Sequence, residues 1–437
     1  MSTQYGLWTR EQLIARVVEL ESRAKGTAVN RDESISRIDA NELLSNVNND
    51  HTEPIKPKKK QFDFSAHPQR FIALRFAYLG WNYNGLAYQY EPTEFPTVEG
   101  EILKALDKAR LISEPEPTTC NFSRCGRTDK GVSAMNQVIS LDVRSNLTKD
   151  EQLDPQNDQR ELPYMSILNS MLPADIVITA ICLRPPTNFN ARFSCLSRHY
   201  RYLIHKDSLD IALMKEAAAK YEGRHDFRNL CKLDGSKQIV NHVREIISSK
   251  IIPHETDENY VIFDLKGLAF LWHQVRCMVA ILLMVGQKLE KPSLIDELLD
   301  VERNPQRPAY AMAHDVPLVL YDCEFPEMEW FPFIKDATSS KVRREVARMR
   351  GVIQSYEIRA LMGNYMKQAF FDKHPDTDKM YTGYDVLNSG DGQGRLYKKH
   401  LPVMSRTLGD PVEMVNQRWR DKKKRKLEEE ERLSKVE

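Results

Sequence analysis

The chain has 437 residues, of which 41% are hydrophobic and 29% charged, so it is long enough for about two to three domains with sizeable cores. Its 63 basic residues nearly balance its 62 acidic ones, and the resulting net charge of +1 excludes a uniformly basic nucleic-acid-binding protein. Any surface that binds phosphate must therefore come from local clustering of cations.

The seven cysteines are odd in number and include no Cys-x-x-Cys pair, which is typical of a reducing compartment and argues against zinc ribbons and fingers. The first residues show no signal pattern, and their glutamates argue against an acid-poor transit peptide. The longest strongly apolar helical stretch, around 278–285, is too short to cross a membrane. We therefore expect a protein of the nucleus and cytoplasm without a membrane partner.

The N-terminal segment is expected to hold a helix over about 11–24, opened by a capping box at Thr9 and closed by Gly26. From about 26 to 67 the composition is polar and poor in aromatic residues, as in a flexible linker. Its basic cluster at 56–60 fits a nuclear-import signal, an RNA contact or a solvated charge run.

The ordered core is predicted to start at Phe71, where apolar residues alternate as in a strand. Further strands are predicted at 137–143, 198–204, 243–252, 259–265 and 318–324, and helices at about 98–109, with Thr97 as its cap, and 272–285, ended by Gly286. This irregular mixture indicates an α+β fold, with a largely antiparallel mixed sheet flanked by helices. Beyond Phe325 the chain becomes an appendage, with a basic amphipathic helix expected around 341–362 and a basic run at 418–426.

The most informative segment is the loop 123–134, which crowds two glycines, several cations and Asp129 between a predicted helix and a strand. By composition alone a charged surface turn is the simplest interpretation, because most aspartates in loops are structural. A phosphate-binding loop would also place two glycines as Gly126 and Gly131 are placed, but Val132-Ser133 stands where the Lys-Ser/Thr pair should follow.

A third interpretation comes from three motifs. Gly126-Arg127-Thr128-Asp129-x-Gly131-Val132 resembles the signature of the TruA family of tRNA pseudouridine synthases. The segments 191–202, with Arg198-x-Tyr200-Arg201-Tyr202 at its end, and 269–276, which reads Ala-Phe-Leu-Trp-His-Gln-Val-Arg, are similar to the second and third motifs of that family. Their order and spacing also agree, over about 71–324.

The residue identities in and around the motifs point to one branch of this family. Arg124-Cys125 before Gly126, Lys130 inside the first motif and the segment 307–313 resemble the eukaryotic branch that modifies positions 38 and 39 of the anticodon arm. The resemblance implies a pseudouridine-synthase-like core with a catalytic cleft between two halves. We divide the chain into an N-terminal helix and linker (1–67), a first half of the core with the Asp129 loop (68–190), a second half (191–326) and a helical basic extension (327–437).

The reaction that the family catalyses breaks the N-glycosidic bond of a uridine, rotates the base and rejoins it through carbon. A carboxylate can form the covalent intermediate, and the resemblance assigns this role to Asp129. It assigns to Arg276 the role of a partner that keeps the carboxylate charged by lowering its pKa. The common alternative is an arginine whose stem packs on the protein while its head reaches solvent. Tyr200 is assigned to stack on the base and to take a proton late in the reaction, with Tyr202 as the better core aromatic.

Substrate binding is assigned by resemblance to Arg127, Arg124, Lys130 and Phe270. A uridine in a stem must leave the helix to react, and Arg127 is assigned to brace the gap, although it could instead bind a phosphate. The isomerisation needs no cofactor, and the sequence shows no metal-ligand spacing and no dinucleotide fingerprint. The expected partners are the anticodon stem-loop of a tRNA, with the C-terminal basic segments on the tRNA body, and a second copy of the chain as a homodimer.

Two other classes of protein remain as alternatives. A non-catalytic RNA-binding protein on the same fold would explain the basic segments, but it leaves Asp129, Tyr200 and Arg276 without a purpose. A phosphotransferase lacks the phosphate loop and the metal-binding carboxylates that it would require.

Overall fold

The computed structural model describes residues 62–333, 339–371, 386–392, 395–396 and 399–434. The helix predicted over 11–24 and the basic cluster at 56–60 lie outside these residues. The division of the chain into four parts stays a prediction.

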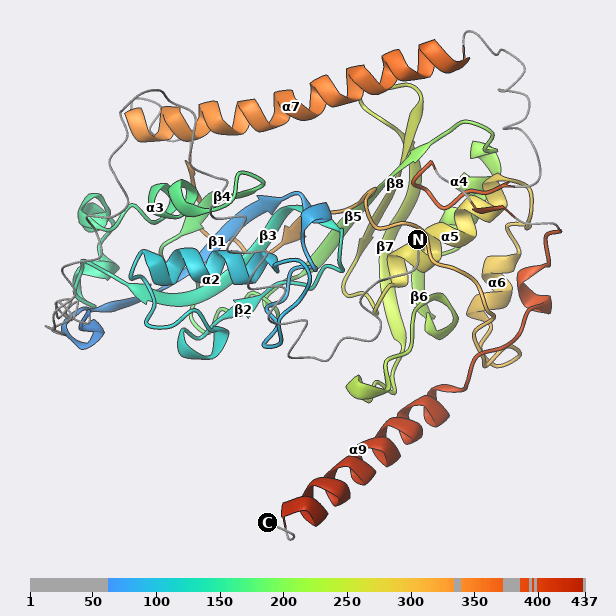
Figure 1. Ribbon diagram of the computed structural model, residues 1–437, viewed down its shortest axis with the longest axis horizontal. Coiled ribbons are helices and arrows are strands. Elements are labelled where there is room, and N and C mark those ends of the chain that lie inside the picture. Colours follow the sequence, from blue (N-terminus) through green and yellow to red (C-terminus); the bar gives the residue numbers. More distant parts are fainter. Residues whose placement is uncertain (1–61, 334–338, 372–385, 393–394, 397–398, 435–437) are drawn as a thin grey trace, which may run out of the picture. The chain divides into compact units, whose positions relative to one another are not determined.

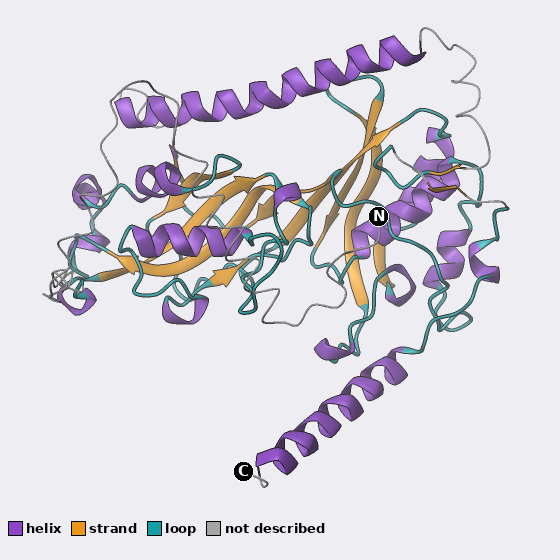
Figure 2. Cartoon of the chain, in the orientation of Figure 1, coloured by secondary structure: helices purple, strands orange, loops and turns teal. Residues whose placement is uncertain are grey.

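A single large sheet runs through the described core (Figure 1, Figure 2). Its order is β10-β4-β1-β3-β9-β5-β8-β7-β6, and β2 pairs with β3 outside this path. Its strands are β1 (Gln69–Tyr78), β2 (Ser123–Arg124), β3 (Ser133–Arg144), β4 (Ile176–Cys182), β5 (Ser197–His205), β6 (Gly223–Asp226), β7 (Val243–Pro253), β8 (Tyr260–Gly267), β9 (Leu318–Glu324) and β10 (Phe331–Pro332). A separate two-stranded sheet pairs β11 (Val386–Leu387) with β12 (Arg395–Leu396).

Near the middle of the large sheet, β3 and β9 form the one parallel pair among the described strands. Ser133 lies opposite Val319 and Ala134 opposite Leu320, while the neighbouring pairs β1 with β3 and β5 with β9 are antiparallel. Because β3 begins directly after the Asp129 loop, this pairing brings the loop to the start of β9, which comes almost two hundred residues later in the chain.

Helices pack on the sheet and on one another. They are α2 (Val98–Lys108), α3 (Tyr164–Met171), α4 (Ile211–Ala219), α5 (Gln274–Gly286) and α6 (Leu294–Leu299). The first contacts α3, which in turn packs on β4, while α4 contacts both β7 and α5. All residues of α5 are buried, as its run of apolar side chains on every face requires.

The predicted α+β class, with a largely antiparallel mixed sheet flanked by helices, is confirmed. The Thr97 cap is also confirmed, since its side-chain oxygen accepts a hydrogen bond from the Gly100 amide at 3.1 Å. The helix expected from 272 instead begins at Gln274, because His273 has a left-handed backbone (φ 59°) that cannot continue a helix.

Two long helices follow the core, α7 (Ser340–Phe371) and α9 (Val412–Ser434). The start of α7 is attached to the core, where the Arg348 guanidinium donates to the carbonyls of Asn169 and Leu172 at 2.7 and 3.1 Å. The basic run at 418–426 lies on α9, and its cations are exposed. Among the described helices, none combines the length and the apolar character that a membrane crossing needs.

Candidate active site

The loop that carries Asp129 is held by buried hydrogen bonds. Gln137, fully buried on β3, donates to the Gly126 carbonyl at 3.0 Å, and the Cys125 amide donates to the Val138 carbonyl at 2.9 Å. Directly before Asp129, the Tyr78 hydroxyl and Thr128 Oγ1 are 2.6 Å apart. These hydrogen bonds attach the loop to the core, so it is not a free surface turn.

Gly131 is required where the loop turns into β3. Its backbone is left-handed (φ 83°), and an added Cβ would lie 2.7 Å from the carboxyl carbon of Asp315. Both the backbone conformation and the space therefore exclude a larger residue. The glycine lets Asp315, which stands just before β9, approach the loop that carries Asp129.

The Asp129 carboxylate is largely buried, with its side chain 27% exposed. Burial raises its pKa from the usual 3.8 to about 6; the Arg276 charge opposes this shift and the nearby Asp315 carboxylate adds to it. The carboxyl is thus mainly ionised at pH 7, but the ionised form is held at a cost in free energy. This is a suitable state for a nucleophile that must also act as a leaving group.

Arg276 lies beside the site on α5 but is not in direct contact with Asp129. Its Nε donates to the Ala313 carbonyl at 2.8 Å, and its Nη2 lies 3.9 Å from Asp315 Oδ2. Among the described residues there is no ion pair within 4.0 Å between Arg276 and Asp129. The predicted effect on the pKa of Asp129 has the expected sign, but burial outweighs it, so the net shift is upwards and not downwards.

Among the described residues, His273 is the one basic side chain within 4.0 Å of the Asp129 carboxylate, and no role was predicted for it from the sequence. Its Nε2 lies 3.4 Å from Asp129 Oδ2, and its ring stacks on that of Trp272 with centroids 4.4 Å apart. Burial, with the charges of Arg276 and Lys232, lowers the pKa of His273 to about 4, so the ring is neutral at pH 7. The Trp272 side chain, and not His273, provides the hydrogen bond that lowers the pKa of Asp129.

Two features of His273 are energetically unfavourable: its backbone conformation and one buried ring nitrogen. Its Nδ1 is buried and has no hydrogen-bond partner within the described part of the chain, and its backbone is left-handed. Strained backbone and unsatisfied polar atoms gather at functional sites. The signal in the sequence was its place in the third motif, three residues before Arg276, which puts both side chains near one another at the start of α5.

Tyr200 and Phe270 form an aromatic pair next to this cluster, with ring centroids 5.0 Å apart and planes at 84°. Tyr200 is 8% exposed, and burial raises the pKa of its hydroxyl above the usual range, with a small contribution from the Asp129 charge. The phenol therefore stays protonated, which suits stacking and donation better than proton acceptance. Tyr202 is fully buried and donates to the His314 carbonyl at 3.0 Å, as expected of a core aromatic.

The three cations predicted to bind substrate lie in different environments. Arg127 is exposed and has no ion pair or hydrogen bond with any other described residue. Lys130 is 54% exposed at the surface, 3.5 Å from Glu94 and near the Phe95 ring. Arg124, in contrast, pairs with the fully buried Glu99. Arg127 and Lys130 are thus available to a ligand, whereas Arg124 has a structural partner that fixes the loop.

Known proteins resemble this chain over most of its length. A protein-family model described as "tRNA pseudouridine synthase" matches residues 217–326. A protein of Saccharomyces cerevisiae named "tRNA pseudouridine(38/39) synthase" is 50% identical over 425 residues, 97% of this chain and 93% of the relative. The chain belongs to the tRNA pseudouridine synthase family.

Other members of the tRNA pseudouridine synthase family agree with this assignment. A human protein also named "tRNA pseudouridine(38/39) synthase" is 44% identical over 73% of this chain and 67% of its own length. A "tRNA pseudouridine synthase A" of Methanococcoides burtonii is 32% identical over 66% of this chain and 94% of its own length. The resemblance drawn from the three motifs is confirmed, and the protein is an enzyme of the isomerase class.

The contact between His273 and Asp129 predicts a change in the pH dependence of the reaction. The rate of pseudouridine formation should rise with pH through about 6, because the role predicted for Asp129 requires its ionised form. In His273→Asn, which tolerates the left-handed backbone, the ionised carboxylate loses the polar ring atom that lies 3.4 Å from it, so the midpoint should move upwards by up to about one pH unit. Profiles of kcat/KM against pH would measure this.

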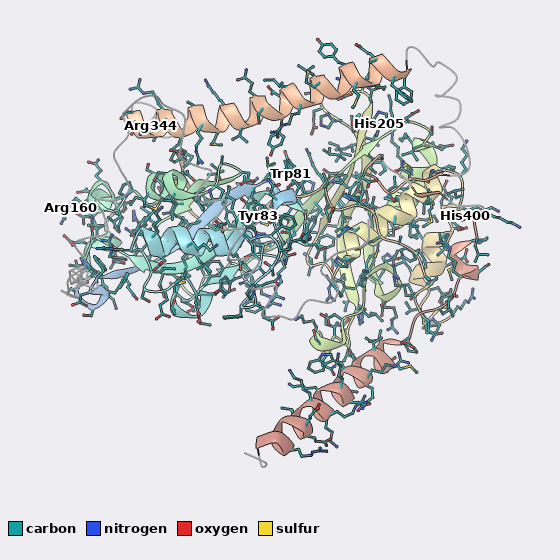
Figure 3. All side chains as sticks on the ribbon, viewed as in Figure 1. Trp81, Tyr83, Arg160, His205, Arg344 and His400 are labelled. Atoms are coloured by element: carbon teal, nitrogen blue, oxygen red, sulfur yellow. The ribbon has the colours of Figure 1, made fainter. Side chains whose placement is uncertain are left out.

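A matched control for that experiment is His205→Asn, on an exposed position of β5 that is labelled in Figure 3. Its profile should coincide with that of the unmodified protein. An unchanged midpoint in His273→Asn, or an equal displacement in the control, would contradict a role of His273 in setting the charge of Asp129.

Proposed function

We propose that this enzyme isomerises uridine to pseudouridine at positions 38 and 39 of the tRNA anticodon arm, with Asp129 as the nucleophile. The observation that carries the proposal is a buried carboxylate with a pKa of about 6, mounted on a rigid loop beside a neutral histidine, an arginine and an aromatic pair. Positions 38 and 39 are taken from the names of two relatives, which are 50% and 44% identical to this chain.

The site supplies what the reaction needs. The ionised Asp129 attacks the base or the sugar and forms a covalent bond to it, while the N-glycosidic bond breaks. Asp129 leaves again when the base has rejoined the sugar through carbon. Atoms balance without a second substrate, because the product is an isomer of the uridine. Tyr200, protonated and packed against Phe270, offers a ring on which the detached base stacks and a hydroxyl that donates to it.

A uridine at the end of a stem must be turned out of the helix before it reaches a buried carboxylate. Arg127 is two residues from Asp129, is exposed, and has no hydrogen bond or ion pair with the other residues that the structure describes. This placement supports its predicted role of bracing the gap that the flipped nucleotide leaves. Lys130, on the other side of Asp129, is placed to contact a backbone phosphate.

Carbodiimide-based mapping of pseudouridine in unmodified tRNA transcripts tests the reaction, the substrate and the nucleophile together. The intact protein should convert positions 38 and 39, and Asp129→Ala should lose conversion by at least about 10⁴-fold while it still binds the transcripts. Asp107→Ala, which removes an aspartate on α2 whose side chain makes no hydrogen bond or ion pair with another described residue, should convert normally. A folded intact protein that binds tRNA without converting it would favour the RNA-binding alternative.

We also propose that the enzyme works as a homodimer through α7. Beyond its attachment at Arg348, this helix contacts the core where Tyr356 packs edge-on against Trp81, a residue labelled in Figure 3, with centroids 5.2 Å apart. Farther along, α7 exposes a stripe at helical spacing that the core does not cover: Ile358, Leu361, Met362, Tyr365 and Met366, between 52% and 69% exposed. An apolar stripe of this size is typical of a surface that another chain covers.

The dimer interface can be tested by placing charges on the stripe. The intact protein should have the mass of a dimer in light scattering at micromolar concentration, and Leu361→Glu with Tyr365→Glu should reduce it to a monomer, because two carboxylates would be buried without partners. Leu153→Glu with Val240→Glu, at two other exposed apolar positions, should remain dimeric. An intact protein that is monomeric would contradict the dimer, and a dimeric double variant would exclude α7 as its interface.

A further inference from the structure

Three cysteines from distant parts of the chain meet behind the candidate active site. Cys125 lies in the Asp129 loop directly after β2, Cys195 precedes β5, and Cys323 lies near the end of β9. Their Sγ atoms all lie within 4.8 Å of one another. Because about seventy or more residues separate each from the next, no local spacing in the sequence reveals the cluster.

The geometry of the cluster is close to that of a metal site. Thiolates that bind one Zn²⁺ at about 2.3 Å are at most about 4.6 Å apart, so small side-chain rotations would suffice to close the site. Cys125 and Cys323 are 1% and 2% exposed, whereas Cys195 is partly exposed and gives an ion a route from solvent. Single buried cysteines pack as small apolar side chains, but such packing does not require three sulfurs to converge.

Charge at the cluster also favours thiolates. The Arg198 guanidinium donates to the Cys125 carbonyl at 2.8 Å, and Arg198 lies opposite Cys323 in the pairing of β5 with β9. A positive charge beside the sulfurs stabilises their deprotonated form. A deprotonated sulfur is what a metal ion binds.

We propose that Cys125, Cys195 and Cys323 together bind one thiophilic metal ion, Zn²⁺ or Cu⁺, which ties the Asp129 loop to the second half of the core. Binding of Zn²⁺ releases the three thiol protons and leaves a net charge of −1, which the neighbouring Arg198 balances. Soft thiolate ligands select these two ions among those of the cell. The ion takes no part in the isomerisation, and it acts on the enzyme by restraining Cys125, four residues before Asp129.

Metal analysis of the full-length protein tests the site directly. The protein, purified with reductant and stripped of metal, should take up one Cd²⁺ per chain, used as a probe, with a sulfur-to-metal charge-transfer band in the ultraviolet. Mass spectrometry of the protein as isolated should identify Zn or Cu at about one ion per chain. Added Zn²⁺ should raise the Tm, because binding to the folded state alone stabilises it.

Substitutions then locate the ligands. Cys195→Ser, which changes the least buried sulfur, should weaken Cd²⁺ binding by about 100-fold or more and abolish the Zn²⁺-dependent rise in Tm, with an unchanged circular dichroism spectrum. Cys120→Ser, at a buried cysteine outside the cluster, should bind as tightly as the unmodified protein. Absence of the charge-transfer band in the unmodified protein, equal affinity in Cys195→Ser, or a disulfide between two of the three cysteines without metal would overturn the proposal.

Discussion

The burial of one carboxylate, that of Asp129, is the constraint on which the rest of this site depends. Taking a carboxylate out of water favours its protonated form, and a second carboxylate, Asp315, stands close enough to add to that effect. The Arg276 charge and a hydrogen bond from the Trp272 side chain offset part of this cost. The outcome is an acid that is ionised near neutral pH yet not strongly stabilised in that form, which suits formation and loss of a covalent bond.

The sheet explains how these groups come together. The parallel pairing of β3 with β9 joins two distant parts of the chain, because the Asp129 loop leads into β3 and Asp315 stands just before β9. Gly131 permits their close approach, and buried Gln137 fixes the loop that follows Cys125. The proposed metal site would connect Cys125, in the same loop, to Cys323 on β9.

Much of this could be predicted from the sequence, and the failures have physical reasons. Half-buried strands such as β1 and β9 alternate in polarity and were predicted almost to their ends, whereas β4 is buried along nearly its whole length and shows no such alternation. The roles assigned to Asp129, Arg276 and Tyr200 came from motifs, and these residues do lie near one another. The pKa of Asp129 and the contact with His273 could not be predicted, because burial and the position of Asp315 follow from the fold. The thiol cluster was missed because its members are distant in the chain.

The central claim, that the Asp129 carboxylate is held ionised against the cost of burial, can be tested by the free energy of unfolding of Asp129→Asn and the unmodified protein between pH 4 and 8. A carboxyl whose pKa is about 6 when folded and 3.8 when unfolded makes the unmodified protein lose stability as pH rises through that interval, because the folded state then holds more protons. Urea titrations should find Asp129→Asn more stable by up to about 3 kcal/mol above pH 7, with the difference gone near pH 4. A difference that does not change with pH, or that favours the unmodified protein at pH 7, would contradict this account.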